Sequence, residues 1–362
     1  MTDDNSAILF LAHTGEVSGA EKVLLDLIAE ALSSGHRVMV ACPGGRLADS
    51  LPEGARHIPI SPLGLGGERG LARVLAAANL AYHWLAAGRT LRKIARTPGT
   101  DTVVNSLFAL PVARLARPPR GASWLVHDTM TSTKQRAVVA MSRPAIRVAV
   151  AVSDATAAPL RAADVPVVVA HNGVRWPVSR LGGELHDPPV VGMLALLTPW
   201  KGHRVLLDAA AMLPHVRIEL AGNSFPGDAD YVAELTARAR KPDLAGRVDF
   251  LGHVDPESAL ARWDVVVSAS TSPEAGPLSV LEAMSHGLPV VGTDHGGTSE
   301  FLADGAGVLV PPGEPSALKS ALELVLQDGD LRHRVAETAR TRVETEHDLS
   351  KTLPYMLRTL IE

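Results

Sequence analysis

The chain has 362 residues, which is long enough for two domains of ordinary size. Hydrophobic residues make up 46% of the chain and charged residues 20%, a balance that excludes a disordered or fibrous protein. The formal net charge of −4 conceals an asymmetry, because residues 1–180 hold 20 Lys and Arg against 13 Asp and Glu, whereas residues 181–362 hold 15 against 26.

The basic first half is compatible with binding to an anionic membrane surface or to an acidic acceptor, and equally with a solvated arginine-rich surface attracted to the acidic half.

Cys42 is the only cysteine, so an internal disulfide is excluded and a reducing, cytoplasmic setting is expected. The longest apolar stretch, Leu71–Gly88, is interrupted by polar residues and predicts no membrane span. The sequence therefore predicts a cytoplasmic protein, with peripheral contact at the inner membrane face left open.

The first half begins with a strand, helix, strand unit. The apolar run Ala7–Ala12 predicts a first strand rather than a signal peptide. Ala20–Leu32 predicts a helix, because its apolar residues recur on one face before Gly35 ends it, and Val38–Ala41 predicts the next strand. Apolar strands that alternate with helices are typical of a parallel sheet covered on both faces.

The same pattern restarts at Val190. The predicted elements are a strand within Val190–Leu197, a helix over His203–Leu213, a strand over Arg217–Ala221, a helix over Tyr231–Arg240, strands over Val248–Leu251 and Val265–Ala269, a helix over Leu278–His286 and a strand over Pro289–Gly292. Arg175–Pro189 is rich in Pro and Gly and is interpreted as a linker. The sequence thus predicts an α/β protein with two doubly wound Rossmann-like domains, over residues 1–174 and 190–345, whose ligands bind beyond the carboxyl ends of the strands in the cleft between them. Residues 346–362 are expected to form a helix that packs back on the N-terminal domain.

The segment Ser270–Glu300 carries the most informative chemistry. Pro277 at a helix start is expected to leave the backbone amides of the next three residues, Leu278, Ser279 and Val280, free at the positive end of the helix dipole. Such an end attracts phosphate. Glu282 shares a helix face with Leu278 and Ser279, where its carboxylate is placed to accept hydrogen bonds from sugar hydroxyls.

Glu274 precedes this helix and stands eight residues before Glu282. Two carboxylates beside an anion site suggest a nucleotide sugar. Exposed glutamate pairs are nevertheless common on helices that bind nothing, so the spacing alone leaves the function open.

The segment resembles the signature of glycosyltransferase family 4, a family of retaining enzymes with the GT-B fold. The matching residues are Glu274, Glu282, Ala283-Met284, Gly287–Val291, Gly296-Gly297 and Glu300. The resemblance implies two Rossmann-like domains facing across a cleft, the N-terminal one binding the acceptor and the C-terminal one binding the nucleotide sugar. It also implies that Glu274 lies near the donor sugar, that Glu282 binds the ribose, and that the backbone from Gly276 and Pro277 to Val280 holds the diphosphate.

Three other segments fit the same resemblance. Thr198–Gly202 is similar to the family's diphosphate-binding segment, in which Lys201 would neutralise the leaving group. Ser18 and Gly19 are similar to the turn before the first helix, where a small residue permits close approach of the donor, and Ser18 is also an ordinary helix N-cap. His127 lies in a His-Asp pair similar to the one whose histidine contacts the donor sugar, although a solitary histidine is more often structural.

Two features depart from the pattern or compete with it. Asp228 and Asp230 have the form of a metal-binding Asp-x-Asp motif, but they precede a predicted helix and are interpreted as capping acids, so no metal is expected. Leu196 occupies the position, five residues before Lys201, where the family usually has an arginine. Its neighbours His203 and Arg204 are the candidates to replace that charge.

The sequence therefore predicts a retaining hexosyltransferase of cell-envelope glycan or natural-product biosynthesis. It would use a UDP or GDP sugar as substrate, a small-molecule, lipid-linked or glycan acceptor, no cofactor and no nucleic acid. His127, Glu274 and Lys201 are the predicted catalytic residues, and the Gly64–Gly70 loop and the Arg89–Arg96 helix are the predicted acceptor elements. The alternatives are a catalytically weakened pseudo-glycosyltransferase or partner subunit, a nucleotide-sugar epimerase, and a peripheral membrane-binding protein.

Overall fold

A computed structural model describes residues 6–64, 70–177 and 184–362. The chain forms two compact units, unit 1 from the N-terminus to Asn172 together with Lys351–Glu362, and unit 2 from Gly173 to Ser350. Residues 65–69 of the predicted acceptor loop and residues 178–183 of the predicted linker lie outside the described residues. No helix in the described ranges is long and apolar enough to cross a membrane.

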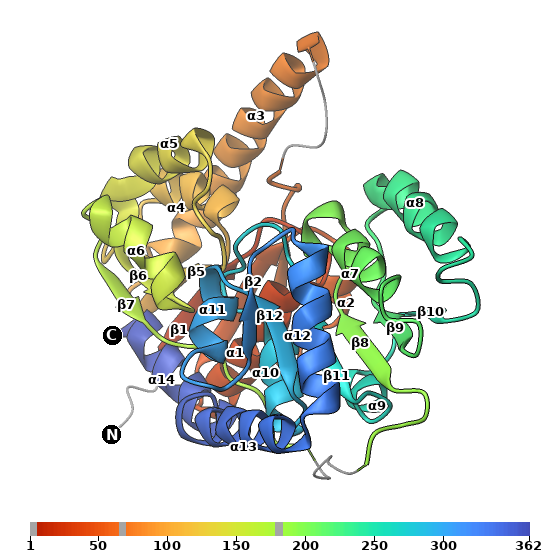
Figure 1. The fold of residues 1–362 in the computed structure, drawn as a ribbon. Coiled ribbons are helices and arrows are strands. Elements are labelled where there is room, and N and C mark those ends of the chain that lie inside the picture. The colour runs from red at the N-terminus through yellow and green to blue at the C-terminus, as the bar shows by residue number, and fades with distance from the viewer. Residues whose placement is uncertain (1–5, 65–69, 178–183) are drawn as a thin grey trace. The chain divides into compact units, whose positions relative to one another are not determined.

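Unit 1 is a parallel sheet of seven strands. Its elements in chain order are β1 (Ala7–Leu11), α1 (Gly19–Ser33), β2 (Arg37–Cys42), α2 (Arg46–Asp49), β3 (Arg56–Pro59), α3 (Gly70–Ala95), β4 (Thr100–Val104), η1 (Leu107–Ala109), α4 (Leu110–Ala116), β5 (Ala122–Val126), α5 (Thr133–Ser142), η2 (Arg143–Ala145), β6 (Ile146–Ala151), α6 (Asp154–Ala162) and β7 (Val167–Val169). The strand order is β3-β2-β1-β4-β5-β6-β7, with helices on both faces of the sheet (Figure 1).

The final helix, α14 (Leu349–Ile361), packs on this sheet through its last turn. The Ser123 hydroxyl on β5 donates a hydrogen bond to the Leu360 carbonyl at 2.6 Å, and the Arg147 guanidinium on β6 donates to the same oxygen at 2.7 Å. Leu360 and its neighbours Met356 and Leu357 are buried. Lys351–Glu362 therefore pack in unit 1, together with the first part of the chain.

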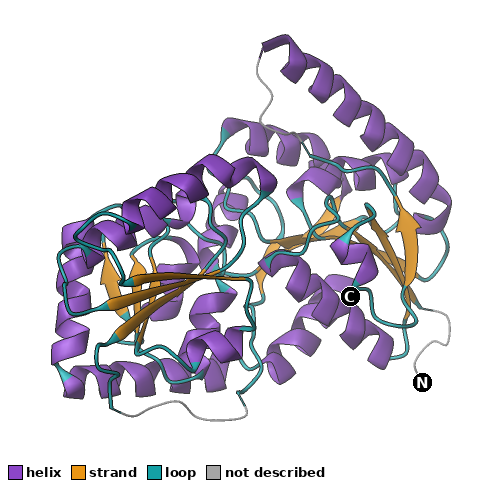
Figure 2. Ribbon diagram, turned by 90° about the vertical axis from the view of Figure 1, so that its right-hand side faces the viewer, coloured by secondary structure: helices purple, strands orange, loops and turns teal. Residues whose placement is uncertain are grey.

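Unit 2 is a second parallel sheet, of six strands. Its elements are β8 (Val190–Leu194), η3 (Pro199–Lys201), α7 (His203–Ala210), β9 (Arg217–Ala221), η4 (Pro226–Asp228), α8 (Ala229–Ala239), β10 (Val248–Gly252), α9 (Pro256–Leu260), β11 (Val265–Ser268), α10 (Leu278–Ser285), β12 (Val290–Thr293), α11 (Gly296–Leu302), β13 (Val308–Val310), α12 (Pro315–Gln327) and α13 (Gly329–Glu346). The strand order is β10-β9-β8-β11-β12-β13, and helices again cover both faces (Figure 2).

Apolar strands between two helical layers account for both cores. In unit 1 every residue of β1 and β5 is buried, including Trp124. In unit 2, Gly192 on the central strand β8 lies under Trp263, and a methyl group at Gly192 would lie 1.8 Å from the indole ring. Glycine at this position therefore makes room for the indole over the sheet.

Both sheets reverse their strand order beside the first strand, between β1 and β4 in unit 1 and between β8 and β11 in unit 2. The prediction of two doubly wound α/β units is thereby confirmed. In such sheets the loops that leave the carboxyl ends of the two strands at the reversal diverge, and the opening between them is the usual binding position. The loops after β8 and β11 are those in which the sequence places Lys201 and Glu274.

Candidate functional site

Lys201 and Glu274 form an ion pair across the strand reversal of unit 2. Lys201 ends η3 after β8, Glu274 lies in the loop after β11, and their Nζ and Oε2 atoms are 2.5 Å apart. The two side chains are only 14% and 8% exposed. The Ser270 hydroxyl donates a hydrogen bond to the second carboxylate oxygen. The structure therefore brings together two of the predicted catalytic residues that lie 73 positions apart in sequence.

Backbone contacts hold the two loops in place. The Thr271 amide donates to the Trp200 carbonyl at 2.7 Å. Gly202 has a φ of 79°, and a Cβ there would lie 1.9 Å from the Ala269 carbonyl, so glycine is required for this approach. The Lys201 ammonium lies 4.3 Å from the centroid of the Trp200 ring, a cation–π contact. The Trp200 ring and the Glu274 carboxylate thus together fix the position of the Lys201 ammonium group.

The Gly-Gly pair that begins α11 packs against the Glu274 loop. The Gly297 amide donates to the Glu274 carbonyl at 2.8 Å. A Cβ at Gly296 would lie 2.5 Å from that carbonyl oxygen, and one at Gly297 would lie 2.3 Å from the Ala275 carbonyl oxygen. The two glycines Gly296 and Gly297 of the sequence signature therefore allow the start of α11 to pack closely against the backbone of the Glu274 loop.

The start of α10 carries two backbone amides for which the described residues supply no acceptor. Pro277 precedes the helix as predicted, and among the described residues no acceptor pairs with the amides of Leu278 and Ser279. The expectation of a free amide at Val280 is wrong, because this amide donates to the Pro277 carbonyl at 3.2 Å. The first turn tightens in this way, and its anion-binding capacity rests on two amides.

Glu282 lies on the same face of α10 as these amides. Leu278, Ser279 and Glu282 are partly exposed, whereas the intervening and following positions face the core; these are Val280, Leu281, Ala283 and Met284. Gly276 is also partly exposed, directly before the helix. One face of the helix end therefore offers two amides and a carboxylate, with Lys201 and Glu274 in the loops of the same sheet edge.

Ser18 and Gly19 begin α1 in unit 1. Ser18 is the N-cap residue, and the Glu21 carboxylate accepts hydrogen bonds from its backbone amide at 3.1 Å and from its hydroxyl at 2.5 Å. Glu21 is 2% exposed, and burial raises the pKa of this carboxyl group. Gly19 is exposed at the first position of the helix. Glu21 therefore fixes the turn that holds both predicted residues.

His127 follows β5 at the carboxyl edge of the unit 1 sheet. Burial lowers the pKa of its imidazole to about 4, so the ring is neutral at neutral pH. Within the part of the chain that the structure describes, its Nε2 atom has no hydrogen-bond partner. A neutral imidazole with an unsatisfied nitrogen can exchange a hydrogen bond with a hydroxyl group, and it cannot neutralise a phosphate.

His13, which no sequence motif singles out, lies two residues after β1 and interacts electrostatically with Asp128. Burial lowers the pKa of His13 while the charge of Asp128 opposes this effect. Burial raises the pKa of Asp128, whose Oδ2 accepts a hydrogen bond from the Leu107 amide at 3.3 Å. A lone histidine carries no motif. The available signal was its place shortly after a fully buried strand at the strand reversal.

Neither neighbour of Lys201 replaces the charge missing at Leu196. His203 is fully buried, and its pKa is lowered to about 4 by burial and then by the charge of Lys201, so the ring is neutral. The Arg204 guanidinium is held by Asp208 at 2.8 Å and by Glu234 at 2.6 Å. Leu196 is itself partly exposed beyond the end of β8. Neither candidate therefore offers a free positive charge in place of the one missing at Leu196.

His203 makes the fold sensitive to acid. The pKa of the His203 imidazole is about 4 in the folded protein and 6.5 in the unfolded chain. Between these two pH values the unfolded state therefore binds more protons than the folded state. The free energy of unfolding consequently falls as the pH drops from 6.5 to about 4. Changing His203→Gln should remove about 3 kcal/mol of this pH dependence, as measured by urea unfolding at several pH values. His215→Gln, at an exposed histidine, is the control for the substitution itself. An unchanged slope in His203→Gln would contradict the assignment.

Asp228 and Asp230 lie at the start of α8. Asp228 is the N-cap residue but makes no side-chain capping bond, and Asp230 lies in the first turn. Both positions agree with acids that interact with the helix dipole.

Two family models match the chain. Residues 17–175 match the model described as Glycosyltransferase Family 4, and residues 179–342 match the model described as Glycosyl transferases group 1. Together the two ranges span most of the chain.

Individual relatives agree with the family models. The chain is 34% identical over 153 residues to the lipopolysaccharide core biosynthesis glycosyltransferase LpsE of Rhizobium meliloti, a match that covers 42% of this chain and less than half of that relative, 43%. It is 28% identical over 366 residues to a phosphatidyl-myo-inositol mannosyltransferase of Mycobacterium tuberculosis, covering 94% of this chain and 92% of that one.

Solved structures show the same fold. Anabaena HepE in complex with UDP and glucose superimposes with a TM-score of 0.82 at 25% identity, covering 98% of this chain and 99% of that chain. WaaG, a glycosyltransferase involved in lipopolysaccharide biosynthesis, gives a TM-score of 0.71 over 98% of this chain and 99% of its own, at 15% identity. The predicted GT-B fold is confirmed, and the chain belongs to glycosyltransferase family 4.

Proposed function

We propose that the protein is a retaining glycosyltransferase that transfers a hexose-type sugar from a nucleoside diphosphate donor to an acceptor hydroxyl. The observation that carries this proposal is the Lys201–Glu274 pair at the strand reversal of unit 2, with Glu274 in the loop that leads to the two amides at the start of α10. A cation and two amides suit a diphosphate, and the carboxylates of Glu274 and Glu282 suit sugar hydroxyls. The diphosphate and the sugar hydroxyls of a nucleotide sugar thus each have a matching group.

In this proposal the leaving diphosphate carries the largest developing charge. Lys201 and the amides of Leu278 and Ser279 stabilise it, which is where preorganised donors contribute most to rate. Glu282 accepts hydrogen bonds from the ribose hydroxyls. Glu274 and, from unit 1, the neutral His127 orient the donor sugar through its hydroxyls. Ser18 and Gly19 are assigned to close approach of the donor on the strength of their motif.

The transfer breaks the bond between the anomeric carbon and the diphosphate oxygen and forms a new bond from that carbon to the acceptor oxygen on the same face. The acceptor's proton passes to the leaving diphosphate. Lys201 and the two amides also compensate the negative charge of the diphosphate when the donor binds. Donor binding is therefore expected without a resident cofactor or a divalent cation. Residues 1–174 are assigned to the acceptor.

We infer a sugar nucleotide with a uridine or guanosine base, and the solved relative HepE supports the uridine alternative. HepE has been solved with UDP and with UDP-glucose, and LpsE acts in lipopolysaccharide core biosynthesis. We infer a place in cell-envelope or other glycan biosynthesis, with a lipid-linked, glycan or small-molecule acceptor.

A test of the proposal measures diphosphate release with UDP-glucose and GDP-mannose in the presence of glycan and lipid-linked acceptors. Acceptor-dependent release, with a product whose anomeric configuration by NMR equals that of the donor, is expected. Inversion of the configuration would contradict the retaining mechanism, and nucleoside diphosphate sugar isomerised without release would favour an epimerase.

A weakened enzyme is the second candidate function, and the surroundings of Leu196 favour it. With His203 neutral and Arg204 held by two carboxylates, the diphosphate has one cation fewer than the family pattern supplies. Leu196→Arg is therefore expected to tighten diphosphate binding about ten- to a hundredfold by calorimetry, since a charge-assisted hydrogen bond contributes about 1.5 to 3 kcal/mol. Leu196→Met is the size-matched control. Equal affinities in the two variants would show that the position does not face the diphosphate.

A further inference from the structure

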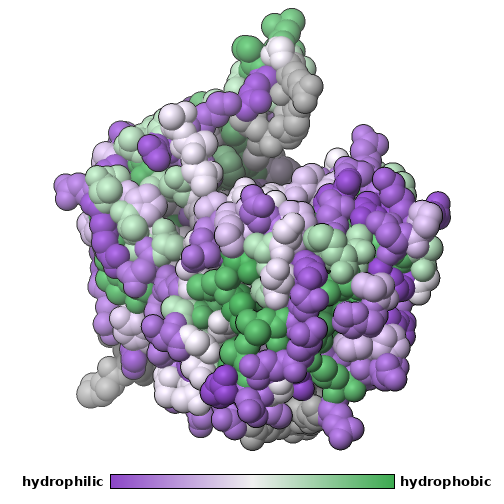
Figure 3. Space-filling model, in the orientation of Figure 1, coloured by the Kyte–Doolittle hydropathy of each residue, from purple (hydrophilic) through white to green (hydrophobic). Residues whose placement is uncertain are grey.

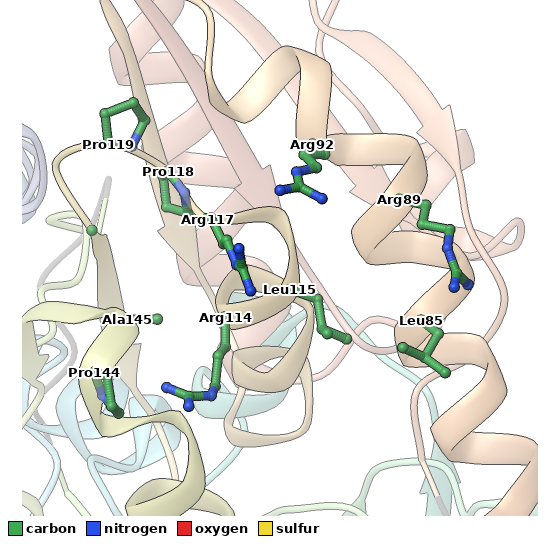
Figure 4. A pocket seen from close by; sticks show the side chains of 11 residues that line it. Leu85, Arg89, Arg92, Arg114, Leu115, Arg117, Pro118, Pro119, Pro144 and Ala145 are labelled. Carbon is green, nitrogen blue, oxygen red and sulfur yellow. The ribbon is translucent and has the colours of Figure 1, made fainter.

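A pocket of about 540 Å³ on unit 1 is lined by four arginines and, among the residues that the structure describes, by no acidic residue. Arg89 and Arg92 come from α3, Arg114 comes from α4, and Arg117 follows α4 directly (Figure 4). The rest of the lining is largely apolar, with Leu85, Leu115 and three prolines. The pocket therefore combines a concentrated positive charge with a non-polar wall.

Within the described ranges of the chain, no hydrogen bond or ion pair engages these four guanidinium groups. The neighbouring Arg120 differs, because it pairs with Asp101 at 3.1 Å. Four like charges around one cavity repel one another unless an anion enters, and guanidinium groups bind phosphate oxygens in a bidentate manner. The complementary ligand is a phosphate-bearing group.

The pocket lies at the opposite edge of the sheet from His127. Gly121 and Ala145, which line it, directly precede β5 and β6, whereas His127 directly follows β5. Five strand residues span roughly 17 Å. A ligand in the pocket is therefore separate from the strand-end site. The arginines of the predicted Arg89–Arg96 acceptor helix also lie towards this amino edge, since α3 ends shortly before β4 begins.

An apolar row on α3 leads into the pocket. Seven exposed residues follow one another at intervals of three or four and so share one helix face; they are Leu71, Leu75, Ala78, Tyr82, Leu85, Arg89 and Arg92. Leu71 is 77% exposed, and Leu75 and Tyr82 are each 65% exposed. Figure 3 shows hydrophobic surface at the projecting end of this helix. Helices that lie in a membrane interface bury apolar side chains and carry basic residues that attract anionic lipids, and this row of α3 supplies both kinds of residue.

We propose that the arginine pocket and the apolar row of α3 form a docking surface for a membrane that contains anionic phospholipid. A headgroup phosphate enters the pocket between Arg92 and Arg114, and Leu71, Leu75 and Tyr82 rest at the boundary of headgroups and acyl chains. The charge of the pocket selects an anion, and the apolar row selects a lipid over a soluble phosphate. This inference does not depend on the proposed transferase activity.

Flotation of the full-length protein with vesicles tests the proposal. The protein is expected to float with phosphatidylcholine vesicles that contain phosphatidylglycerol and to remain at the bottom with phosphatidylcholine alone. The double change Arg92→Gln with Arg114→Gln should weaken partitioning at least about tenfold. Leu71→Ser with Leu75→Ser should also weaken partitioning, while leaving thermal stabilisation by soluble glycerol phosphate unchanged.

The matched control removes two exposed arginines elsewhere on the same unit, Arg56→Gln with Arg136→Gln, and should change partitioning by less than about twofold. An equal loss of vesicle partitioning in this control would mean that the protein is attracted by its overall charge, and would overturn the assignment of headgroup binding to the pocket. If glycerol phosphate stabilised the protein, if this effect required Arg92 and Arg114, and if the protein did not bind vesicles, the pocket would be a site for a soluble anion instead. Arginine-dependent dimerisation in sedimentation without vesicle binding would show a second copy as the occupant. Unfolding curves that match those of the unchanged protein exclude misfolding.

Discussion

Lys201→Met is expected to lower the turnover number about a hundred- to a thousandfold, because it removes a preorganised charge from the leaving diphosphate. It also leaves the nearly buried Glu274 carboxylate without its 2.5 Å partner. Unpairing a buried charge typically costs about 3 kcal/mol of unfolding free energy. Diphosphate release and urea unfolding measure the two effects separately.

The double variant Lys201→Met with Glu274→Gln separates catalysis from stability. It removes the unpaired carboxylate charge, so stability should recover in part while turnover stays low. Lys319→Met is the matched control, because Lys319 pairs with Glu323 at 2.5 Å on the surface of α12, and its loss should cost about 0.5 kcal/mol with turnover unchanged. Because Glu274 is itself a predicted catalytic residue, the double variant is compared with Glu274→Gln alone; equal turnover in the two would show that Lys201 has no leaving-group role.

Glu282→Ala is expected to weaken binding of the donor diphosphate about ten- to a hundredfold. A carboxylate that accepts hydrogen bonds from hydroxyl groups contributes about 1.5 to 3 kcal/mol, and nothing else on the exposed face of α10 replaces it. The unfolding free energy should change by less than about 1 kcal/mol, because the side chain is partly exposed and alanine favours the helix. Titration calorimetry gives the affinity.

Glu337→Ala serves as the control for this substitution. Glu337 is an exposed glutamate within a helix of the same unit, so its removal changes the net charge of unit 2 equally. Its affinity for the diphosphate should equal that of the unchanged protein. A Glu282→Ala protein that bound as tightly as this control would place Glu282 outside the donor site.

The fold was predictable because parallel strands buried on both faces are continuous apolar runs, and those runs are visible in the sequence. The strand Arg217–Ala221 was predicted to the residue, and helix ends such as that of α7 differ by a few positions. The first half was harder beyond Ala41, because most of its longest helix, α3, is exposed, and its apolar residues do not mark a face that packs on the core.

The site was predictable as a set of residues and not as an arrangement. The motif named Lys201 and Glu274, but their ion pair arises from the order of β8 and β11 in the sheet, which no local pattern encodes. The amide of Val280 was predicted to be free because proline usually opens a regular first turn, whereas here the turn tightens. The neutral state of His203 and the two partners of Arg204 likewise depend on tertiary burial and pairing.

Calorimetric titration of the purified protein with UDP, GDP, ADP and TDP, with and without a divalent cation, is the decisive test of the donor site. We expect UDP or GDP to bind without the cation, and we expect Glu282→Ala but not Glu337→Ala to weaken this binding. Failure of every diphosphate to bind would contradict the donor site formed by Lys201, Glu282 and the start of α10, and would make the weakened or silent protein the better interpretation.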